Sequence, residues 1–527
     1  MAIRPKQITT FTRWSGLAAL LFVALLVAGP LLALWARADT SATLTGSDWA
    51  AIKFTLFQAT LSAIISVVLA IPVARALARR SFRGRGALVT LLGAPFLLPV
   101  IVAIFGLLAI WGRSGLVSQI LLSFGLERLN IYGLSGVLLA HVFFNLPLVT
   151  RLILQGWGRI PVEHFRLSAQ LGMSPKDVFL RLELPMLRSI LPGAFLLVFL
   201  LCVTSFAVAL TLGGGPKATT IELAIYQALR FEFALGKAAT LGLIQFAICA
   251  IIAFWSLRVT VPVAFGDGLS AVTQRWDVSS RWLLWQDRLV LIAVTGFLGA
   301  PLVAVVVRGL PALTNLPPAI WPAMLNSLTV ALFSAALSVL LALALAGFID
   351  SLKVRHQKMS SIVEGVGLLT LAASPFVLGT GLFIIIHPIA DPFALALPVT
   401  ALVNAAISLP LALRALLPAL QHNRLTYGRL ADSLNIRGWS RFRLTTWPAI
   451  RKPLGFSTGL AAALSMGDLG VITLFAPPDV ETLPLVMYRL MGAYRMDEAA
   501  SVALILVTLT LTLFWIFDRG GRLGHQT

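Results

Sequence analysis

Long apolar blocks alternate with short polar connections along the whole chain. A block of about 20 residues is long enough for a helix to cross the ~30 Å hydrocarbon core of a bilayer. The hydropathy therefore predicts twelve membrane helices. We expect them at about 15–36, 54–77, 88–111, 134–154, 189–212, 238–258, 287–308, 325–348, 363–387, 394–417, 453–476 and 499–518. This pattern predicts an all-α polytopic membrane protein.

The charges in the connections alternate from one side of the predicted membrane to the other. The connections after the second and eighth blocks are basic, whereas the one after the seventh block, GLPALTNLPPAIWPA, holds no charge. Because Lys and Arg gather on the cytoplasmic side, this bias predicts that both termini lie in the cytoplasm. The first apolar run, 16–35, is longer than the core of a cleaved signal peptide, so we interpret it as a membrane helix.

The chain contains an internal repeat. Pro185 and Pro448 are 263 residues apart, and so are Arg151 and Arg414. Longer segments match at similar offsets: 61–70 with 333–342, and 219–229 with 481–491. We expect a first repeat at 1–260, a linker at 261–286 and a second repeat at 287–527. Six spans in each repeat make the repeats parallel, related by an axis along the membrane normal, with a pathway along that axis.

Composition changes this picture little. The chain is 58% hydrophobic and 12% charged, with a formal net charge of +20. A basic balance can indicate nucleic-acid binding, but cytoplasmic Lys and Arg explain it in a membrane protein. Cys202 and Cys249 lie inside apolar blocks and indicate neither a disulfide framework nor a metal site.

Each repeat carries one charged insertion after its fourth span, which we expect to be a cytoplasmic loop at about 158–188 and about 421–452. In the first loop, 163–171 can form a short helix that ends at Gly172, a residue that tolerates positive φ. Ser174 is placed as an N-cap, Pro175 as the first helical residue and Asp177 as the acid that reaches back to the cap. The loop is predicted to be helix, tight turn, helix.

The second loop is a weaker copy of the first. Asn435 replaces the glycine and tolerates the same left-handed conformation. Arg437 stands where Ser174 stood, so we expect poorer capping. Trp439 and Phe442 make the apolar face of its second helix. Such loops can lie on lipid headgroups, but two copies on one membrane face favour docking onto a two-fold symmetric cytoplasmic partner.

The two loops resemble the cytoplasmic loop of ABC-importer permeases, in which Glu-Ala-Ala is followed after three residues by Gly and then by a distal Leu-Pro. This sequence departs from the pattern because RLS (166–168) and RLA (429–431) replace Glu-Ala-Ala. The acid is absent from both loops, so the contact is expected to rest on shape and apolar packing. The resemblance implies these ATPase-docking residues: Arg166, Leu167, Ala169, Gly172, Ser174, Asp177, Pro185, Arg429, Leu430, Ala431, Asn435, Trp439 and Pro448.

Three segments, 138–155, 212–229 and 434–444, narrow the resemblance to the fused permease subunit of bacterial thiamine and thiamine pyrophosphate ABC importers. The likeness covers essentially the full chain. It implies an inner-membrane protein, a periplasmic binding protein and two copies of a separate ATPase that bind ATP and Mg. The sequence has no G-x-x-x-x-G-K-[ST] motif, so this chain is expected to be no enzyme and to bind no cofactor itself.

Other function classes remain open from the residues. Ferric-iron importer permeases share the fused architecture and are the nearest alternative. A secondary transporter coupled to protons or sodium would need more Asp, Glu and His along the spans. A membrane-embedded enzyme would need a catalytic cluster, and the sequence contains no H-E-x-x-H or C-x-x-C motif.

Asp468 is the clearest ionisable residue inside a predicted span, and such residues are functional candidates. Its carboxylate is suited to a cation such as thiamine in the substrate pathway. The alternative is a packing role at a helix break next to Gly467 and Gly470, and this reading is favoured.

The other candidates for the substrate pathway also have structural alternatives. His141 and Asn145 share one face of the fourth span, where hydrogen bonds between helices are favoured over ligand contact. Phe143 and Phe144 can make cation–π contacts, although packing is favoured. Glu222 lies in an outer connection, in a surface or re-entrant helix or in a plain loop.

Overall fold

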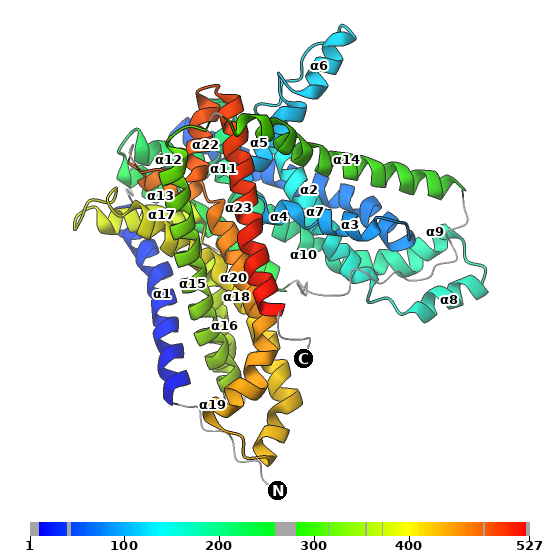
Figure 1. The fold of residues 1–527 in the computed structure, drawn as a ribbon, viewed down its shortest axis with the longest axis vertical. Helices are drawn as coiled ribbons and strands as arrows, with labels where there is room; N and C mark the ends of the chain where they lie inside the picture. Colours follow the sequence, from blue (N-terminus) through cyan, green and yellow to red (C-terminus); the bar gives the residue numbers. More distant parts are fainter. Residues whose placement is uncertain are drawn as a thin grey trace. The chain divides into compact units, whose positions relative to one another are not determined.

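The computed structural model describes residues 10–38, 44–258, 281–314, 316–353, 356–371, 373–477 and 480–522. Within these ranges the chain is helical and has no strand. The chain divides into two compact units. Unit 1 comprises Met1–Thr43, Ile225–Ala247 and Thr314–Thr527, and unit 2 comprises Leu44–Ala224 and Ile248–Leu313. The prediction of an all-α polytopic membrane protein is confirmed (Figure 1).

Unit 2 is built mainly from the helices of the first repeat. They are α2 (Gly46–Arg79), α3 (Arg85–Leu91), α4 (Ala94–Leu97), α5 (Val100–Trp111), α6 (Leu116–Ser123), α7 (Leu134–Trp157), α8 (Val162–Gln170), α9 (Pro175–Val178), the π-helix η1 (Phe179–Glu183), α10 (Leu184–Val203), α11 (Phe206–Leu212) and η2 (Pro216–Ala218). Unit 2 also includes α14 (Arg281–Ala312), the first helix of the second repeat. The boundaries between the units fall within α12 (Ile221–Arg230) and α13 (Leu235–Arg258).

Unit 1 contains α1 and the remaining helices of the second repeat. They are α1 (Thr10–Arg37), α15 (Ile320–Lys353), α16 (Gln357–Leu368), η4 (Leu369–Leu371), α17 (Pro375–Ile386), α18 (Ala396–Ser433), α19 (Gly438–Arg441), the π-helix η5 (Phe442–Thr446), α20 (Trp447–Met466), α21 (Gly470–Phe475), α22 (Leu483–Gly492) and α23 (Met496–Arg522).

Eleven described helices are long and apolar enough to cross a membrane, one fewer than the sequence predicts. The difference lies at the predicted span 363–387, which is divided between α16 and α17. Ser374 caps the second piece and Pro375 begins it, because proline has no N–H to donate and is favoured in the first turn. The predicted span 88–111 is likewise broken, at Gly93 and before Val100.

Part of the first repeat matches the second repeat helix by helix. At an offset of 263 residues, α9, η1 and α10 have the same lengths and bounds as α19, η5 and α20. The backbone N–H of Ile221 donates to the Thr55 hydroxyl over 2.9 Å, and that of Leu483 donates to the Ser327 hydroxyl over 2.8 Å. These bonds join equivalent positions, so the same local design occurs twice.

The first helix of each repeat packs with helices of the other repeat. In unit 1, α1 packs on α15 and α17 (Figure 1), and in unit 2, α14 packs on α5 and α2. A Cβ on Gly381 would lie 2.5 Å from the Pro30 carbonyl oxygen, and one on Gly106 would lie 2.6 Å from that of Pro301. Equivalent glycines therefore let equivalent proline-bearing helices approach closely.

The compact units thus differ from the sequence repeats 1–260 and 287–527 in the placement of these first helices. The predicted linker 261–286 lies largely outside the described residues. Its last part belongs to α14, which begins at Arg281. Asp287, the first residue assigned to the second repeat, is therefore already inside a helix.

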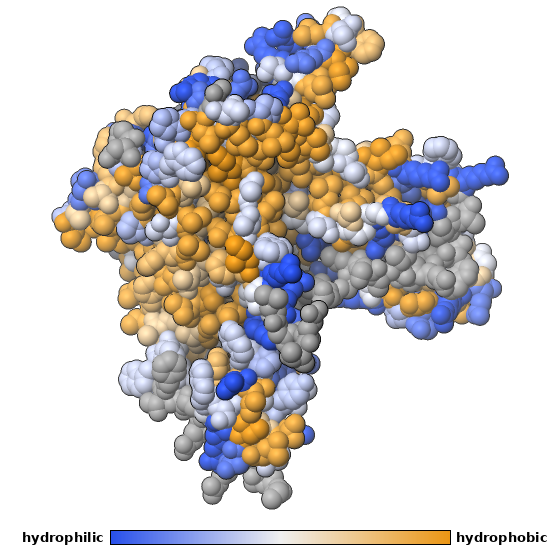
Figure 2. All heavy atoms as spheres, in the orientation of Figure 1, coloured by the Kyte–Doolittle hydropathy of each residue, from blue (hydrophilic) through white to orange (hydrophobic). Residues whose placement is uncertain are grey.

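Large apolar side chains cover the outer faces of the long helices. On α15, Leu325, Phe333 and Leu340 are all more than half exposed. Figure 2 shows hydrophobic residues over the flank of unit 1 where α15 and α23 lie. An exposed apolar face of this extent fits contact with lipid.

Candidate functional site

The first cytoplasmic loop has the predicted turn. Gly172 has a φ of 61°, and α8 ends just before it. Ser174 and Asp177 form the capping box: the Asp177 N–H donates to Ser174 Oγ over 3.3 Å, and the Ser174 N–H donates to Asp177 Oδ2 over 3.2 Å. Pro175 is the first helical residue. The predicted helix, turn and N-terminal cap are confirmed, and the turn is fixed by its own residues.

The loop is anchored on α2 through a buried ion pair. Arg75 Nε donates to Glu183 Oε2 over 2.7 Å, and the Glu183 side chain is fully buried. The Arg75 guanidinium also lies over the Phe179 ring, with Cζ 4.6 Å from the centroid. Phe179 and Glu183 are the two ends of η1, and short π-helices occur often at functional sites. The sequence did not indicate this partner, because 108 residues separate Arg75 from Glu183.

A second ion-pair group lies at the same end of α2. Arg79 Nη2 donates to Asp287 Oδ1 over 2.6 Å, and Arg80 Nε donates to Asp287 Oδ2 over 2.8 Å. Asp287 is buried near the start of α14. These basic residues, which the sequence assigned to membrane orientation, therefore also hold α14 against α2 inside unit 2.

The second loop repeats the turn with different chemistry. Asn435 takes a φ of 53°, as predicted for the residue in the glycine position. Arg437, at the N-cap, makes no capping hydrogen bond with its side chain in the described structure. Instead, Arg441 donates to Asp432 over 2.7 Å across the turn. Gly438 adds a further positive φ of 56°, which the sequence reasoning missed.

The helix before the turn also differs between the loops. In the first repeat, α7 ends at Trp157 and α8 starts at Val162 after a short break. In the second repeat, α18 continues without a break from the membrane to Ser433. The second loop therefore continues directly from its membrane helix, whereas a short break, here called the joint, precedes the first loop.

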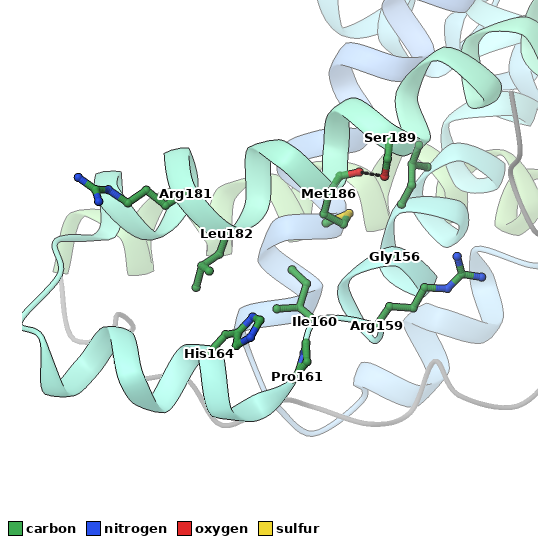
Figure 3. Close-up of a pocket in the computed structure, with 10 residues that line it drawn as sticks. Gly156, Arg159, Ile160, Pro161, His164, Arg181, Leu182, Met186 and Ser189 are labelled. Atoms are coloured by element: carbon green, nitrogen blue, oxygen red, sulfur yellow. Dashed lines mark hydrogen bonds between the residues drawn. The ribbon is translucent and has the colours of Figure 1, made fainter.

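This joint leaves a cavity of about 440 Å³ between α8 and the start of α10. Figure 3 shows the imidazole of His164 and the side chains of Leu182 and Met186 around it. The full lining is Gly156, Arg159, Ile160, Pro161, His164, Arg181, Leu182, Met186, Ser189 and Ile190. In the figure Arg159 and Arg181 lie at opposite ends of the cavity, so their charges do not converge on one point.

Most residues assigned to ATPase docking are accessible. Leu167, Leu430 and Trp439 are between 53% and 74% exposed. Trp439 stacks on Phe442 with ring centroids 5.1 Å apart, as expected for one apolar face. The exposed set also includes Arg166, Ala169, Gly172, Ser174, Pro185, Arg429, Asn435 and Pro448, whereas Asp177 is half-buried and Ala431 is buried. The turns therefore present apolar and basic side chains together.

A buried polar cluster joins three membrane helices of unit 2. The Ser62 hydroxyl and His141 Nδ1 are 3.0 Å apart, and Asn145 Nδ2 donates to Cys202 Sγ over 3.3 Å. Gln58 Nε2 donates to the Cys202 carbonyl oxygen over 3.0 Å. The favoured reading of His141 and Asn145 as links between helices is supported by this geometry.

The equivalent positions of unit 1 form a simpler link. Asn404 Nδ2 donates to Ser465 Oγ over 3.1 Å, joining α18 to α20. Asn404 and Ser465 stand 263 residues after His141 and Cys202. Polar contacts between the same helices are thus kept in both repeats with different residues.

Asp468 lies at the break between α20 and α21, where the sequence anticipated one. Its Oδ1 accepts from the Gly470 N–H over 3.1 Å, which ties the carboxylate to the start of α21. Ser205 holds the equivalent position after α10. This geometry favours the structural role of Asp468 over substrate contact.

The remaining pathway candidates are engaged in packing. The Phe143 side chain is fully buried and meets the rings of Phe144 and Phe297 edge to face, with centroids 5.5 and 5.9 Å away. Glu222 lies in the first turn of α12, which confirms a helix at this place. Its side chain is only 1% exposed, so it does not present a surface to a partner.

Comparison with known proteins places the chain in a family. The thiamine transport system permease protein ThiP of Brucella abortus (strain 2308) is 40% identical over 517 residues, 95% of this chain and 94% of that protein. ThiP of Escherichia coli (strain K12) is 38% identical over 530 residues, 98% of each chain. The chain belongs to the ThiP family of transport permeases. No protein-family model matches the chain.

Membership of the ThiP family agrees with the fold. The chain is a multi-pass membrane permease, a subunit of a transport system. The molybdenum transport system permease protein ModB of Azotobacter vinelandii is 29% identical over 218 residues, 96% of ModB but 41% of this chain. ModB is therefore similar to a segment of this chain that is about as long as one repeat.

Proposed function

We propose that the chain is the permease subunit of an ABC importer that moves thiamine and its phosphates from the periplasm to the cytoplasm. The observation that carries this proposal is the near-full-length similarity to ThiP proteins. The relatives named above are thiamine and molybdenum permeases. A ferric-iron importer and an ion-coupled secondary transporter were the alternatives, and no observation favours either.

The two cytoplasmic loops are the proposed ATPase-docking surfaces, here called the coupling loops. Each receives one copy of a separate ATPase, which binds ATP and Mg. The exposed apolar side chains of Leu167, Leu430 and Trp439 support such a contact. Because Arg166 and Arg429 replace the acid of the ABC-importer pattern, the contact depends on the shape of the turn and on apolar burial.

Transport then proceeds by alternating access. A periplasmic binding protein delivers the substrate to the outer face, and ATP binding closes the ATPase pair and moves the repeats. The basic connections support an orientation with both termini in the cytoplasm of a bacterial inner membrane. The anchoring of Glu183 by Arg75 supports transmission from the first coupling loop to α2.

The test uses the complete complex in proteoliposomes. Thiamine uptake should require ATP, the ATPase and the binding protein, and thiamine-loaded binding protein should stimulate ATP hydrolysis. If ferric-loaded binding protein stimulates ATP hydrolysis and thiamine-loaded binding protein does not, the substrate is ferric iron and not thiamine. Uptake by this chain alone would contradict the importer mechanism.

A further inference from the structure

The second coupling loop is connected to α15 by an ion pair of its own. Arg424 Nε lies 3.0 Å from Asp350 Oδ1, and both side chains are partly buried. Asp350 is in the last turn of α15, and Arg424 lies on the part of α18 that runs beyond the predicted span 394–417. Lys353 Nζ donates to Gln421 Oε1 over 3.3 Å and adds a second polar contact between the same two helices.

Apolar packing brings the members of this ion pair together. The helices α15 and α18 pack along a buried cluster that includes Ile349, Leu352 and Leu417. Leu417 lies about two helical turns before Arg424, so both residues occupy the same face of α18. Asp350 directly follows Ile349 in the chain. The ion pair therefore continues a buried contact between the two helices.

The charges are reversed relative to the first coupling loop. The helices α2 and α15 are equivalent, and each is 34 residues long. In the first repeat the membrane helix carries the base, Arg75, and the loop carries the acid, Glu183. In the second repeat the membrane helix carries the acid, Asp350, and the loop carries the base, Arg424. Both repeats thus connect the loop to the same membrane helix, with opposite polarity.

Each ion pair also holds a different arm of its loop. We call the helix before the turn the incoming arm and the helix after the turn the outgoing arm. Glu183 lies on the outgoing arm, whereas Arg424 lies on the incoming arm. The position equivalent to Arg424 is Pro161 in the joint, and the position equivalent to Glu183 is the uncharged Thr446 in η5, where no residue is buried. Neither loop can therefore form the ion pair of the other.

We infer that Asp350 and Arg424 are positioning residues for transport, which hold the incoming arm of the second coupling loop on α15. The second loop then moves α15 through its incoming arm, and the first loop moves α2 through its outgoing arm. This inference rests on the proposed function. The continuous helix α18 supports it, because the incoming arm of the second loop has no break, whereas the joint interrupts that of the first loop.

The first experiment tests the anchor without depending on the substrate. Asp350→Asn removes the acid and leaves the sequence of α18 unchanged. In the complete complex, hydrogen exchange of the backbone amides of residues 425–433 should speed up about twofold to fivefold, the range of a partly exposed ion pair. The reversed pair, Asp350→Arg/Arg424→Asp, should restore slow exchange.

The control for the anchor is Lys358→Gln, at an exposed position of α16. It should leave the exchange of residues 425–433 as in the wild type. Unchanged exchange in Asp350→Asn, or exchange in the reversed pair as fast as in Asp350→Asn, would overturn the anchor.

The second experiment tests which arm transmits movement. Thr426→Gly/Tyr427→Gly softens the incoming arm of the second loop between Arg424 and the turn, because glycine weakens a helix. The matched variant is Glu163→Gly/His164→Gly, at the equivalent exposed positions of the first loop. Thiamine-loaded binding protein should stimulate ATP hydrolysis much less in the second-loop variant, and the first-loop variant should retain the stimulation.

Two results would contradict the assignment of the arms. One is an equal response of the two glycine variants, and the other is a loss of stimulation confined to the first-loop variant. If the wild-type complex moves no thiamine, the proposed function fails, and hydrogen exchange still decides whether Asp350 holds the incoming arm.

Discussion

Arg75 and Glu183 form a buried ion pair, 2.7 Å between Nε and Oε2, that joins membrane helix α2 to the end of the first coupling loop. The same arginine lies over Phe179 at the other end of η1. One side chain thus holds both ends of the π-helix. A displacement of the loop is therefore expected to move α2 with it.

Replacing this arginine should both destabilise the chain and uncouple the loop. Arg75→Gln removes the counter-charge of the buried Glu183 carboxylate, a change that typically costs about 3–5 kcal/mol. Thermal unfolding of the purified chain should show the loss, and ATP hydrolysis should respond less to the binding protein. Arg83→Gln, at an exposed position of the next connection, is the control. Equal stability of the two variants would contradict the role of the ion pair.

The N-terminal cap of α9 should stabilise the first coupling loop, and the second coupling loop should show no equivalent stabilisation. Ser174→Ala removes the acceptor for the Asp177 N–H and should cost about 1 kcal/mol of local stability. Hydrogen exchange of the backbone amides of residues 176–178 should speed up. Arg437→Ala is the matched control because Arg437 makes no capping bond with its side chain in the described structure. Similar effects in both loops would show that the capping box is unimportant.

The turn at Gly172 should be needed for ATPase binding. Gly172→Val places a β-branched residue at a φ of 61°, where an L side chain costs roughly 1–2 kcal/mol. The ATPase should co-purify less, while membrane insertion stays intact. Asn435→Gly keeps the same conformation available in the second loop and should leave co-purification unchanged. Normal ATPase recovery with Gly172→Val would count against the docking role.

Adding one methyl group where α1 or α14 packs closely on its neighbour should lower the stability of the chain. In Gly381→Ala the added Cβ meets the Pro30 backbone in unit 1, and in Gly106→Ala it meets the Pro301 backbone in unit 2. Overpacking of this kind typically costs about 1–3 kcal/mol. Gly299→Ala is the control, because nothing lies within 4 Å of its added Cβ. Thermal unfolding should separate the first two variants from the third.

Asp468 should act through its hydrogen bond and not through its charge. Asp468→Asn keeps an oxygen for the Gly470 N–H and should retain thiamine uptake, whereas Asp468→Ala should reduce uptake and stability together. Uptake assays beside thermal unfolding measure both effects. A stable Asp468→Asn protein that no longer transports would instead assign the carboxylate to the cationic substrate.

Local features of this protein follow from short stretches of sequence. The apolar blocks place most of the membrane helices, and the Gly172 turn and the Ser174 cap depend on residues within a few positions of each other. The repeat is visible because two copies of one pattern lie in one chain. Pro375 begins a new helix inside a predicted span. Hydropathy did not predict this division, because it does not register that proline lacks a backbone N–H.

The sequence by itself determined the helical membrane architecture, the two repeats and the form of the coupling loops. Only the tertiary structure decided that Arg75 meets Glu183 and that α1 packs on α17 through Pro30 and Gly381. The physical reason is range. Hydropathy and capping act between near neighbours in the chain, whereas these contacts join residues more than one hundred positions apart and arise only when helices pack.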